Sequence, residues 1–144
     1  MEAGSRHETW GHTINATKQN VKDEIFKITS GRGVDHAAIT AGLPSTLVET
    51  LKFTAKRGII NIFAETSAGT KTETEPNILH YNEIFLTGTE DYTYEMYQRA
   101  FKFIITRRIE VKKLITHRYK LEEIYDTIKT WERKEESLKI ILLP

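Results

Sequence analysis

The chain has 144 residues, of which 39% are hydrophobic and 28% charged, a balance typical of one globular domain. Its 21 basic and 20 acidic residues nearly cancel, so the charge gives no sign of a nucleic-acid or membrane-surface partner. No run approaches the roughly 20 apolar residues of a bilayer-spanning helix, and no apolar stretch follows the first six residues, which predicts that a secretory signal is absent. The absence of cysteine excludes disulfides and thiolate chemistry and fits a cytoplasmic location.

Helix-like and strand-like patterns alternate along the chain. The predicted elements are, in chain order, a helix over 18–30, a strand over 34–41, a helix over 45–56, strands over 58–63 and 83–88, helices over 97–105 and 121–131, and a strand over 138–143. Ser45 is predicted to cap the second helix directly after Pro44, and Gly58 to end it. Segment 64–78 is rich in Thr, Gly, Ser and Glu and is predicted to be a loop.

Strands that alternate with helices of about a dozen residues predict a parallel sheet covered by helices on both faces. In open sheets of this kind, ligands bind beyond the carboxyl ends of the strands. Three places in the chain meet that description: Ala41-Gly42, Phe63-Ala64-Glu65, and the turn from Gly88 to Tyr92. We expect the strand ends at Phe63 and Gly88 to line one shared crevice.

A glycine-rich phosphate-binding turn has the pattern G-x-G-x-x-G between a strand and a helix. No three of the eight glycines have that spacing, and Gly31-Arg32-Gly33 is the one G-x-G present. His36 stands in the position of the third glycine, and the turn lies between a helix and a strand, which is the reverse of the required order. We interpret it as the C-cap of a helix followed by a turn.

The remaining candidates for chemistry are isolated side chains. A catalytic zinc needs about three converging protein ligands. The histidines are scattered singly along the chain, at His7, His12, His36, His80 and His117. A structural or solvated role is favoured for each of them, and for His117 a structural hydrogen bond is favoured over proton transfer. Tyr92, Tyr94 and Tyr97 could stack on a base, but packing at the start of a helix is favoured.

Six stretches of the chain, taken together and in order, carry a resemblance to a known family. They are HTIN (12–15), ITSGRGVDHAAITAG (28–42), LKFTAKRGIINIF (51–63), NILHYNEIFLTGTEDYT (77–93), LITHRYKLEEIYDTI (114–128) and LKIILLP (138–144). Their order and spacing resemble the C-terminal half of the medium-chain dehydrogenases, which include zinc-type alcohol, sorbitol and threonine dehydrogenases. The HYNE and THRYKLEE patterns look closest to the polyol branch, whereas the residues before His12 match the family poorly.

The resemblance implies an α/β fold: a partial Rossmann-like, mostly parallel sheet with flanking helices that lacks the first βαβ unit. It further implies that residues 1–144 form a single truncated cofactor-type domain, in which 114–144 is the closing segment that would return to a missing catalytic domain. NAD or NADP would lie across the predicted strand ends. The implied cofactor-binding residues are Ala41, Gly42, Phe63, Ala64, Glu65, Glu90, Asp91 and Tyr92.

Two features separate the chain from an intact member of that family. The family holds its catalytic zinc with Cys, His and Glu from a preceding domain, so no catalytic and no metal-binding residue is assigned here. The family also usually has small, apolar or basic residues at the second and third strand ends. In this chain Glu65, Glu90 and Asp91 are acidic and would repel a pyrophosphate unless they point at ribose hydroxyls.

The expected function is therefore that of the C-terminal part of a zinc-type, NAD(P)-dependent dehydrogenase, which moves a hydride from a secondary alcohol or polyol and is inactive as this chain alone. The alternative is a non-catalytic, truncated remnant or an association module. A sheet cut after its early strands exposes an apolar edge, so a homo-oligomer or another partner at that edge is expected. A third possibility is an unrelated nucleotide-binding α/β protein with similar patterning. No nucleic acid and no membrane is expected as a partner.

Overall fold

The computed structural model describes residues 11–133 and 137–144. They form two compact units, divided between Glu90 and Asp91, which are described separately. The first unit contains α1 (Val21–Ile28), β1 (Val34–Ile39), α2 (Pro44–Leu51), β2 (Thr54–Ile62), α3 (Pro76–Asn82) and β3 (Phe85–Gly88). The second contains α4 (Tyr94–Ile105), η1 (Val111–Leu114), β4 (Ile115–Lys120), η2 (Leu121–Glu123), α5 (Ile124–Glu132) and β5 (Lys139–Leu143).

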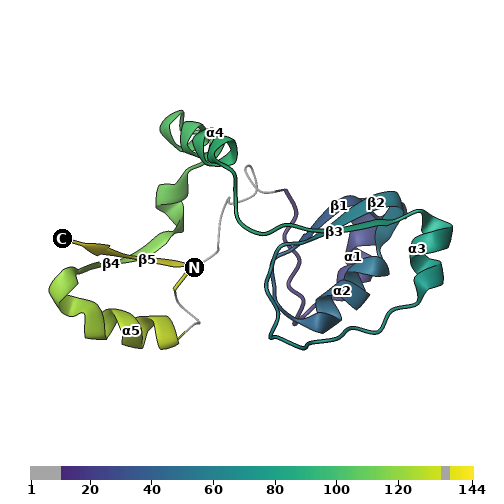
Figure 1. Ribbon diagram of the computed structural model, residues 1–144, viewed down its shortest axis with the longest axis horizontal. Helices are drawn as coiled ribbons and strands as arrows, with labels where there is room; N and C mark the ends of the chain where they lie inside the picture. Colours follow the sequence, from purple (N-terminus) through teal and green to yellow (C-terminus); the bar gives the residue numbers. More distant parts are fainter. Residues whose placement is uncertain (1–10, 134–136) are drawn as a thin grey trace. The chain divides into compact units, whose positions relative to one another are not determined.

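A three-stranded parallel sheet in the order β1-β2-β3 forms the frame of the first unit (Figure 1). Ile39 at the end of β1 pairs with Ile62 at the end of β2, which in turn pairs with Gly88 at the end of β3. Because the strands are parallel and in register at these residues, their carboxyl ends lie in one row at one edge of the sheet. The predicted α/β fold, with parallel strands and flanking helices, is confirmed.

The core of the first unit lies where the sheet meets α2 and α3. Its buried members are Ile39, Leu51, Ile60 and Ile84, with Ala37, Leu47, Ile62, Ile78 and Leu79 packed against them. Ile60 is completely buried at the centre of β2. Alternate residues of a strand point to the same face, so Ala37 and Ile39 of β1 meet Ile60 and Ile62 of β2 in one apolar layer. This layer fixes β1 and β2 in register up to their carboxyl ends.

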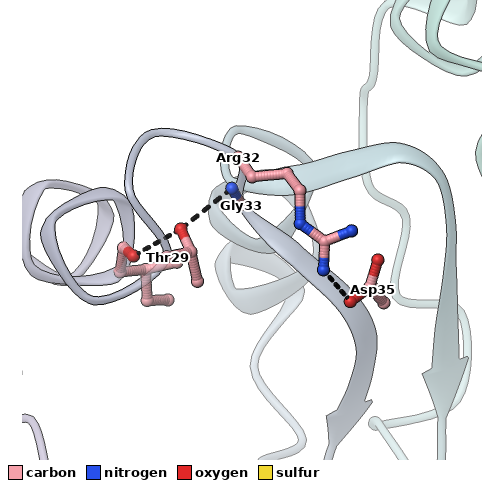
Figure 2. A network of polar contacts seen from close by, with 5 residues as sticks. Thr29, Arg32, Gly33 and Asp35 are labelled. Atoms are coloured by element: carbon pink, nitrogen blue, oxygen red, sulfur yellow. Dashed lines mark hydrogen bonds and ion pairs between the residues drawn. The ribbon is translucent and has the colours of Figure 1, made fainter.

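The turn between α1 and β1 is a helix C-cap, as predicted from Gly31-Arg32-Gly33 (Figure 2). The Thr29 hydroxyl donates to the carbonyl oxygen of Ile25 over 2.7 Å and accepts from the backbone N–H of Gly33 over 3.0 Å. Gly31 and Gly33 have φ values of 84° and 85°, a region that favours glycine. A Cβ at Gly33 would also overlap the carbonyl oxygen of Phe53, so the close packing of this turn against Phe53 requires glycine.

The prediction for the second helix is wrong at both ends. Pro44 is its first residue and Leu43 its N-cap, so Ser45 does not cap it. Proline already has the φ of a helix and needs no N–H at that position, which lets the helix begin one residue earlier than expected. The helix also ends at Leu51 instead of running to residue 56, because the chain from Thr54 onward pairs with β1 as β2.

The helix α3 was not predicted, and its first three residues lie within the segment 64–78 that was predicted to be a loop. Pro76 is its first residue, and Glu83 ends it with a left-handed φ of 53°. The Glu83 carboxylate lies 3.6 Å from Lys56 Nζ and 3.5 Å from Arg57 Nε, which ties the end of α3 to β2. Seven residues give too short a window for helical periodicity to identify.

The second unit contains a two-stranded parallel sheet of β4 and β5, with α5 contacting both strands. Its helices α4 and α5 and its last strand fall where the sequence predicts them. The strand β4 was missed because its alternation places His117 and Tyr119 half-buried between exposed polar residues. The Tyr119 hydroxyl lies 2.7 Å from the Thr130 hydroxyl, which joins β4 to α5. The assignment of 114–144 as a closing segment stays a prediction.

No helix within residues 11–133 and 137–144 has both the length and the apolar character that crossing a bilayer requires.

Candidate cofactor wall at the strand ends

Backbone hydrogen bonds join the three strand ends of the first unit. The carbonyl oxygen of Ile39 accepts from the N–H groups of Phe63 and Ala64 over 3.0 and 2.9 Å. The N–H of Thr89 donates to the carbonyl oxygen of Ile62 over 3.1 Å. The turn at 63–65 therefore begins beside the end of β1, and the turn at 89–90 begins beside the end of β2. Both turns lie along the row of strand ends.

The turns after β1 and β2 also touch each other through Gly42. A Cβ at this position would overlap the carbonyl oxygen of Glu65. The turn that starts at Phe63 therefore lies directly against the turn that starts at Thr40, and a side chain larger than hydrogen at residue 42 would separate them. Of the eight predicted residues, Gly42 and Glu65 are thus in contact through backbone atoms.

A cavity of about 120 Å³ opens at the ends of β1 and β2. Its walls are mostly apolar and carry three threonines; they are formed by Ile39, Ala41, Leu43, Pro44, Leu47, Ile62, Ala64, Thr66, Thr70 and Thr72. Ala41 and Ala64, both predicted, face it from two strand ends. The threonines come from the loop after β2, and one of them, Thr72, donates to the carbonyl oxygen of Pro44 over 3.5 Å. The high threonine content of this loop was the one feature of the sequence that could have indicated that the loop lines the cavity.

A polar pair that sequence reasoning missed joins the ends of β2 and β3. Asn61 Nδ2 lies 3.1 Å from Thr89 Oγ1, and Thr89 Oγ1 lies 3.3 Å from Asn61 Oδ1. Asn61 interrupts the apolar run of β2, and a polar residue in such a run is a signal that could have identified it. The pair fixes the start of the turn that carries Glu90.

The other predicted residues divide between the two units. Phe63 is 59% exposed at the end of β2, and the Glu65 and Glu90 side chains are exposed as well. Asp91 and Tyr92 belong to the second unit, where Asp91 has a left-handed φ of 56°. The Tyr92 ring stacks on Tyr97 with centroids 6.0 Å apart, so the predicted packing at the start of a helix is confirmed for this pair.

The histidines of the described residues occupy separate structural positions. His80 lies beside the Tyr81 ring at 5.1 Å, and His117 Nδ1 lies 3.0 Å from the Thr116 hydroxyl, which confirms its structural hydrogen bond. Within residues 11–133 and 137–144, no three His, Cys, Asp or Glu side chains come together as a metal site would require. His7 lies outside the described residues.

The strand ends fit part of a dinucleotide and not the whole of it. Ligand pockets have volumes of about 300–1,000 Å³, whereas the cavity here has about 120 Å³. Its uncharged wall suits a neutral ring or amide, but no glycine-rich turn is available for the pyrophosphate. The exposed carboxylates of Glu65 and Glu90 stand at the same strand ends and disfavour a dianion.

Comparisons with known proteins agree with this architecture, although no family model matches the chain. The chain is 32% identical over 134 residues to a sorbitol dehydrogenase from Bacillus subtilis (strain 168), which covers 92% of the chain and 37% of that protein. A crystal structure of an alcohol dehydrogenase zinc-binding domain protein from Burkholderia ambifaria superposes with a TM-score of 0.79 at 27% identity, over 91% of the chain and 36% of that structure. A zinc-binding dehydrogenase from Sinorhizobium meliloti 1021, solved bound to NADP, gives 0.78 at 22% identity over 91% and 38%.

The fold is thus that of Rossmann-type alcohol dehydrogenase domains. More narrowly, the resemblance of this chain to the C-terminal part of the zinc-type alcohol and sorbitol dehydrogenases is confirmed by the match to the Bacillus subtilis enzyme. The chain spans 37% of the length of that enzyme.

Proposed function

We propose that this chain supplies the nicotinamide-facing wall of an NAD(P)-dependent, zinc-type dehydrogenase and does not oxidise alcohols by itself. The observation that carries the proposal is the row of three strand ends. At this row the turn at Gly42 packs directly against Glu65, and Ala41 and Ala64 line one small cavity. Ligands of open α/β sheets bind at such a row. The similarity to a sorbitol dehydrogenase supports a secondary alcohol or polyol as the substrate of the complete enzyme.

In this proposal the chain's own residues exclude water and orient the flat nicotinamide ring. Ala41 and Ala64 are small enough to let a planar group approach the backbone at the strand ends, and the cavity threonines offer hydroxyl groups at its rim. The nicotinamide of the cofactor would supply the hydride acceptor. The turn for the pyrophosphate, the zinc ligands and the proton acceptor are not assigned to any residue of this chain, and the expected cytoplasmic location stays a prediction.

Titration with NADH and NADPH, followed by nicotinamide fluorescence, tests the proposal. We expect weak, saturable binding of one of the two cofactors to the wild-type chain. Ala64→Asp puts a carboxylate on the cavity and is expected to weaken binding about tenfold or more, a cost of about 1.4 kcal/mol. Ala68→Asp adds the same charge to the same loop at an exposed residue outside the cavity wall and is the matched control.

Three outcomes would contradict this proposal. One is the absence of saturable binding up to millimolar cofactor. The second is turnover of sorbitol by this chain alone with NAD and zinc, since that would require a complete site. The third is an equal effect of Ala64→Asp and Ala68→Asp, which would show that the cavity is not where the cofactor lies.

The second candidate is a non-catalytic association module. It is favoured by the edge strand β3, whose four residues are all exposed and include Phe85 at 61% and Leu86 at 41%. Light scattering on the purified chain would distinguish the candidates, because a module of this kind self-associates at micromolar concentration whereas a cofactor wall has no need to.

A further inference from the structure

We propose that the negative charge of the strand ends, carried chiefly by Glu65 and Glu90, makes this wall prefer the oxidised nicotinamide ring to the reduced one. The oxidised ring is a cation, whereas the reduced ring is neutral. The role rests on the proposed function, because the two carboxylates act on the cofactor of the same wall. It adds to that function the property by which the wall distinguishes the two forms of the cofactor.

Glu65 is held beside the cavity by its neighbours in the chain. Ala64 before it and Thr66 after it both line the cavity. Its backbone carbonyl leaves no space for a Cβ at Gly42, so this turn is packed against the turn after β1. Because consecutive Cα atoms are about 3.8 Å apart, the Glu65 carboxylate lies within roughly 10 Å of the cavity wall whichever rotamer it adopts.

Glu90 occupies the corresponding place after β3. It follows Thr89, whose N–H donates to the carbonyl oxygen of Ile62 over 3.1 Å. Ile62 lines the cavity, and the Thr89 hydroxyl is also paired with Asn61 of the same strand. Bonds from β2 therefore hold the backbone before Glu90 at the row of strand ends.

No ion pair neutralises either carboxylate. Among residues 11–133 and 137–144, the ion pairs of Lys and Arg involve neither Glu65 nor Glu90. Glu49 and Glu83, by contrast, each lie next to a basic side chain. The two strand-end carboxylates are exposed, so solvent and salt screen their attraction for a cation but no bound partner cancels it.

One basic residue opposes the two carboxylates. Lys71 lies between Thr70 and Thr72, both of which line the cavity, so it also stands beside the wall. Segments 63–75 and 88–90 together carry four acidic residues and this one lysine, a net charge of −3. The charge around the strand ends is therefore negative even with Lys71 present.

The preference follows from the one charge that differs between the two forms. The pyrophosphate is the same in both, so its repulsion by the carboxylates cancels in the ratio of the two dissociation constants. The remaining difference is the attraction of each carboxylate for the cationic ring. At roughly 10 Å beside solvent, this attraction tightens binding of the oxidised form about two- to fivefold for each carboxylate. The wall then binds the oxidised cofactor and releases the reduced one more readily, as the oxidation of an alcohol requires.

The test uses the ring alone as the probe: 1-methylnicotinamide, which is cationic, and its neutral 1,4-dihydro form. Neither probe carries a phosphate, so neither is repelled as an anion. NMR titration of the 15N-labelled chain, followed at the Ala41 and Ala64 amides, gives both dissociation constants. We expect the cation to bind about two- to tenfold tighter at low salt. The preference should fall as NaCl is raised to about 1 M, where charges are screened within about 3 Å.

Three variants of the strand-end loops change charge with little change of shape. Glu65→Gln and Glu90→Gln should each lower the preference for the cation about two- to fivefold, whereas Lys71→Gln should raise it by a similar factor. Asp35→Asn is the matched control, because it removes the same charge about 13 Å along β1 from Ile39 and should leave the preference unchanged. Circular dichroism would verify that all four variants keep the fold.

Three results would overturn the role of the carboxylates. They are equal binding of the two probes at low salt, an unchanged preference in both Glu→Gln variants, and a lowered preference in Lys71→Gln. A titration with NADH separates this failure from that of the proposed function. Saturable NADH binding without a preference between the probes removes only the role of the carboxylates. Absence of binding for NADH and for both probes removes the cofactor wall and that role together.

Discussion

The two units of the chain differ in how much of their apolar surface they bury themselves. All the buried hydrophobic side chains of the described residues belong to the first unit, with Ile60 at the centre. No described residue of 91–144 is buried, although its helices α4 and α5 have clear apolar faces. The first unit is therefore held together by its own buried core. The helices of the second unit form from local sequence patterns, and the unit's own residues do not bury their apolar faces.

The largest test of this difference is to remove one isoleucine from each unit. Ile60→Ala leaves a cavity in the buried layer and should lower the free energy of unfolding by about 3 kcal/mol. Ile104→Ala on α4, where the side chain is 40% exposed, should cost less than about 1 kcal/mol. Urea denaturation followed by circular dichroism measures both, and similar losses would show that the second unit has an equally packed core.

A second test compares two glycines at the strand ends of the first unit. Gly42→Ala should cost about 2 kcal/mol, because the added Cβ overlaps the carbonyl oxygen of Glu65 and must push the two turns apart. Gly88→Ala is the control: its Cβ would lie 3.6 Å from the Ile62 carbonyl oxygen, an ordinary contact, so a change within about 0.5 kcal/mol is expected. Thermal unfolding of the two variants side by side checks the pair. Equal stabilities would mean that the turns at 42 and 65 are not in contact.

The polar pair at the ends of β2 and β3 should have a smaller effect. Thr89→Val removes both hydrogen bonds to Asn61 and should cost about 1 kcal/mol. Thr89→Ser keeps the hydroxyl and should cost less. The chemical shift of the Glu90 amide in NMR spectra would report whether the turn has moved. An unchanged shift in Thr89→Val would show that the pair of Asn61 and Thr89 does not position this turn.

The smallest expected effect is a pH dependence of α4 in the second unit. Hydrogen bonds from the backbone N–H of Glu95 and from Thr93 at the helix N-cap lower the pKa of the Glu95 carboxyl below its ordinary value of 4.5. Because the pKa is lowered in the folded state, the charged carboxylate stabilises the helix fully when the pH is above the ordinary pKa. This stabilisation is lost as the pH falls through the folded-state pKa. Glu95→Gln should make the NMR signals of Tyr94 and Met96 independent of pH below 4.5. The same titration in the variant as in the wild type would contradict this cause.

The sequence predicted elements well where one pattern ran long enough to be unambiguous. The apolar spacing from Tyr97 to Ile105 located α4 in this way. The run at 34–41 is shorter, but its small and apolar residues were sufficient to locate β1. The errors at Ser45 and at α3 share a cause, since proline at the first helical position begins a helix without a polar cap and seven residues show no clear period. The missed strand β4 needed its pairing with β5 to be recognised, because the polar residue His117 occupies one of its half-buried positions.

The candidate site was predictable in its backbone and not in its side chains. The general rule for parallel sheets placed Ala41 and Ala64 at one edge, and the structure puts both on one cavity. No pattern in the sequence indicates that Gly42 contacts Glu65 or that Asn61 pairs with Thr89, because both contacts join segments that are distant along the chain. The cofactor-binding role of all eight predicted residues remains a prediction.

The central claim is that the three strand ends form one wall for the nicotinamide half of a cofactor. The most direct measurement is an NMR titration of the 15N-labelled chain with NADH. The account predicts that the amide signals of Ala41, Ala64 and Glu90 shift together and fit a single dissociation constant, while those of β5 stay in place. Shifts at only one strand end, or shifts that fit different constants, would contradict it.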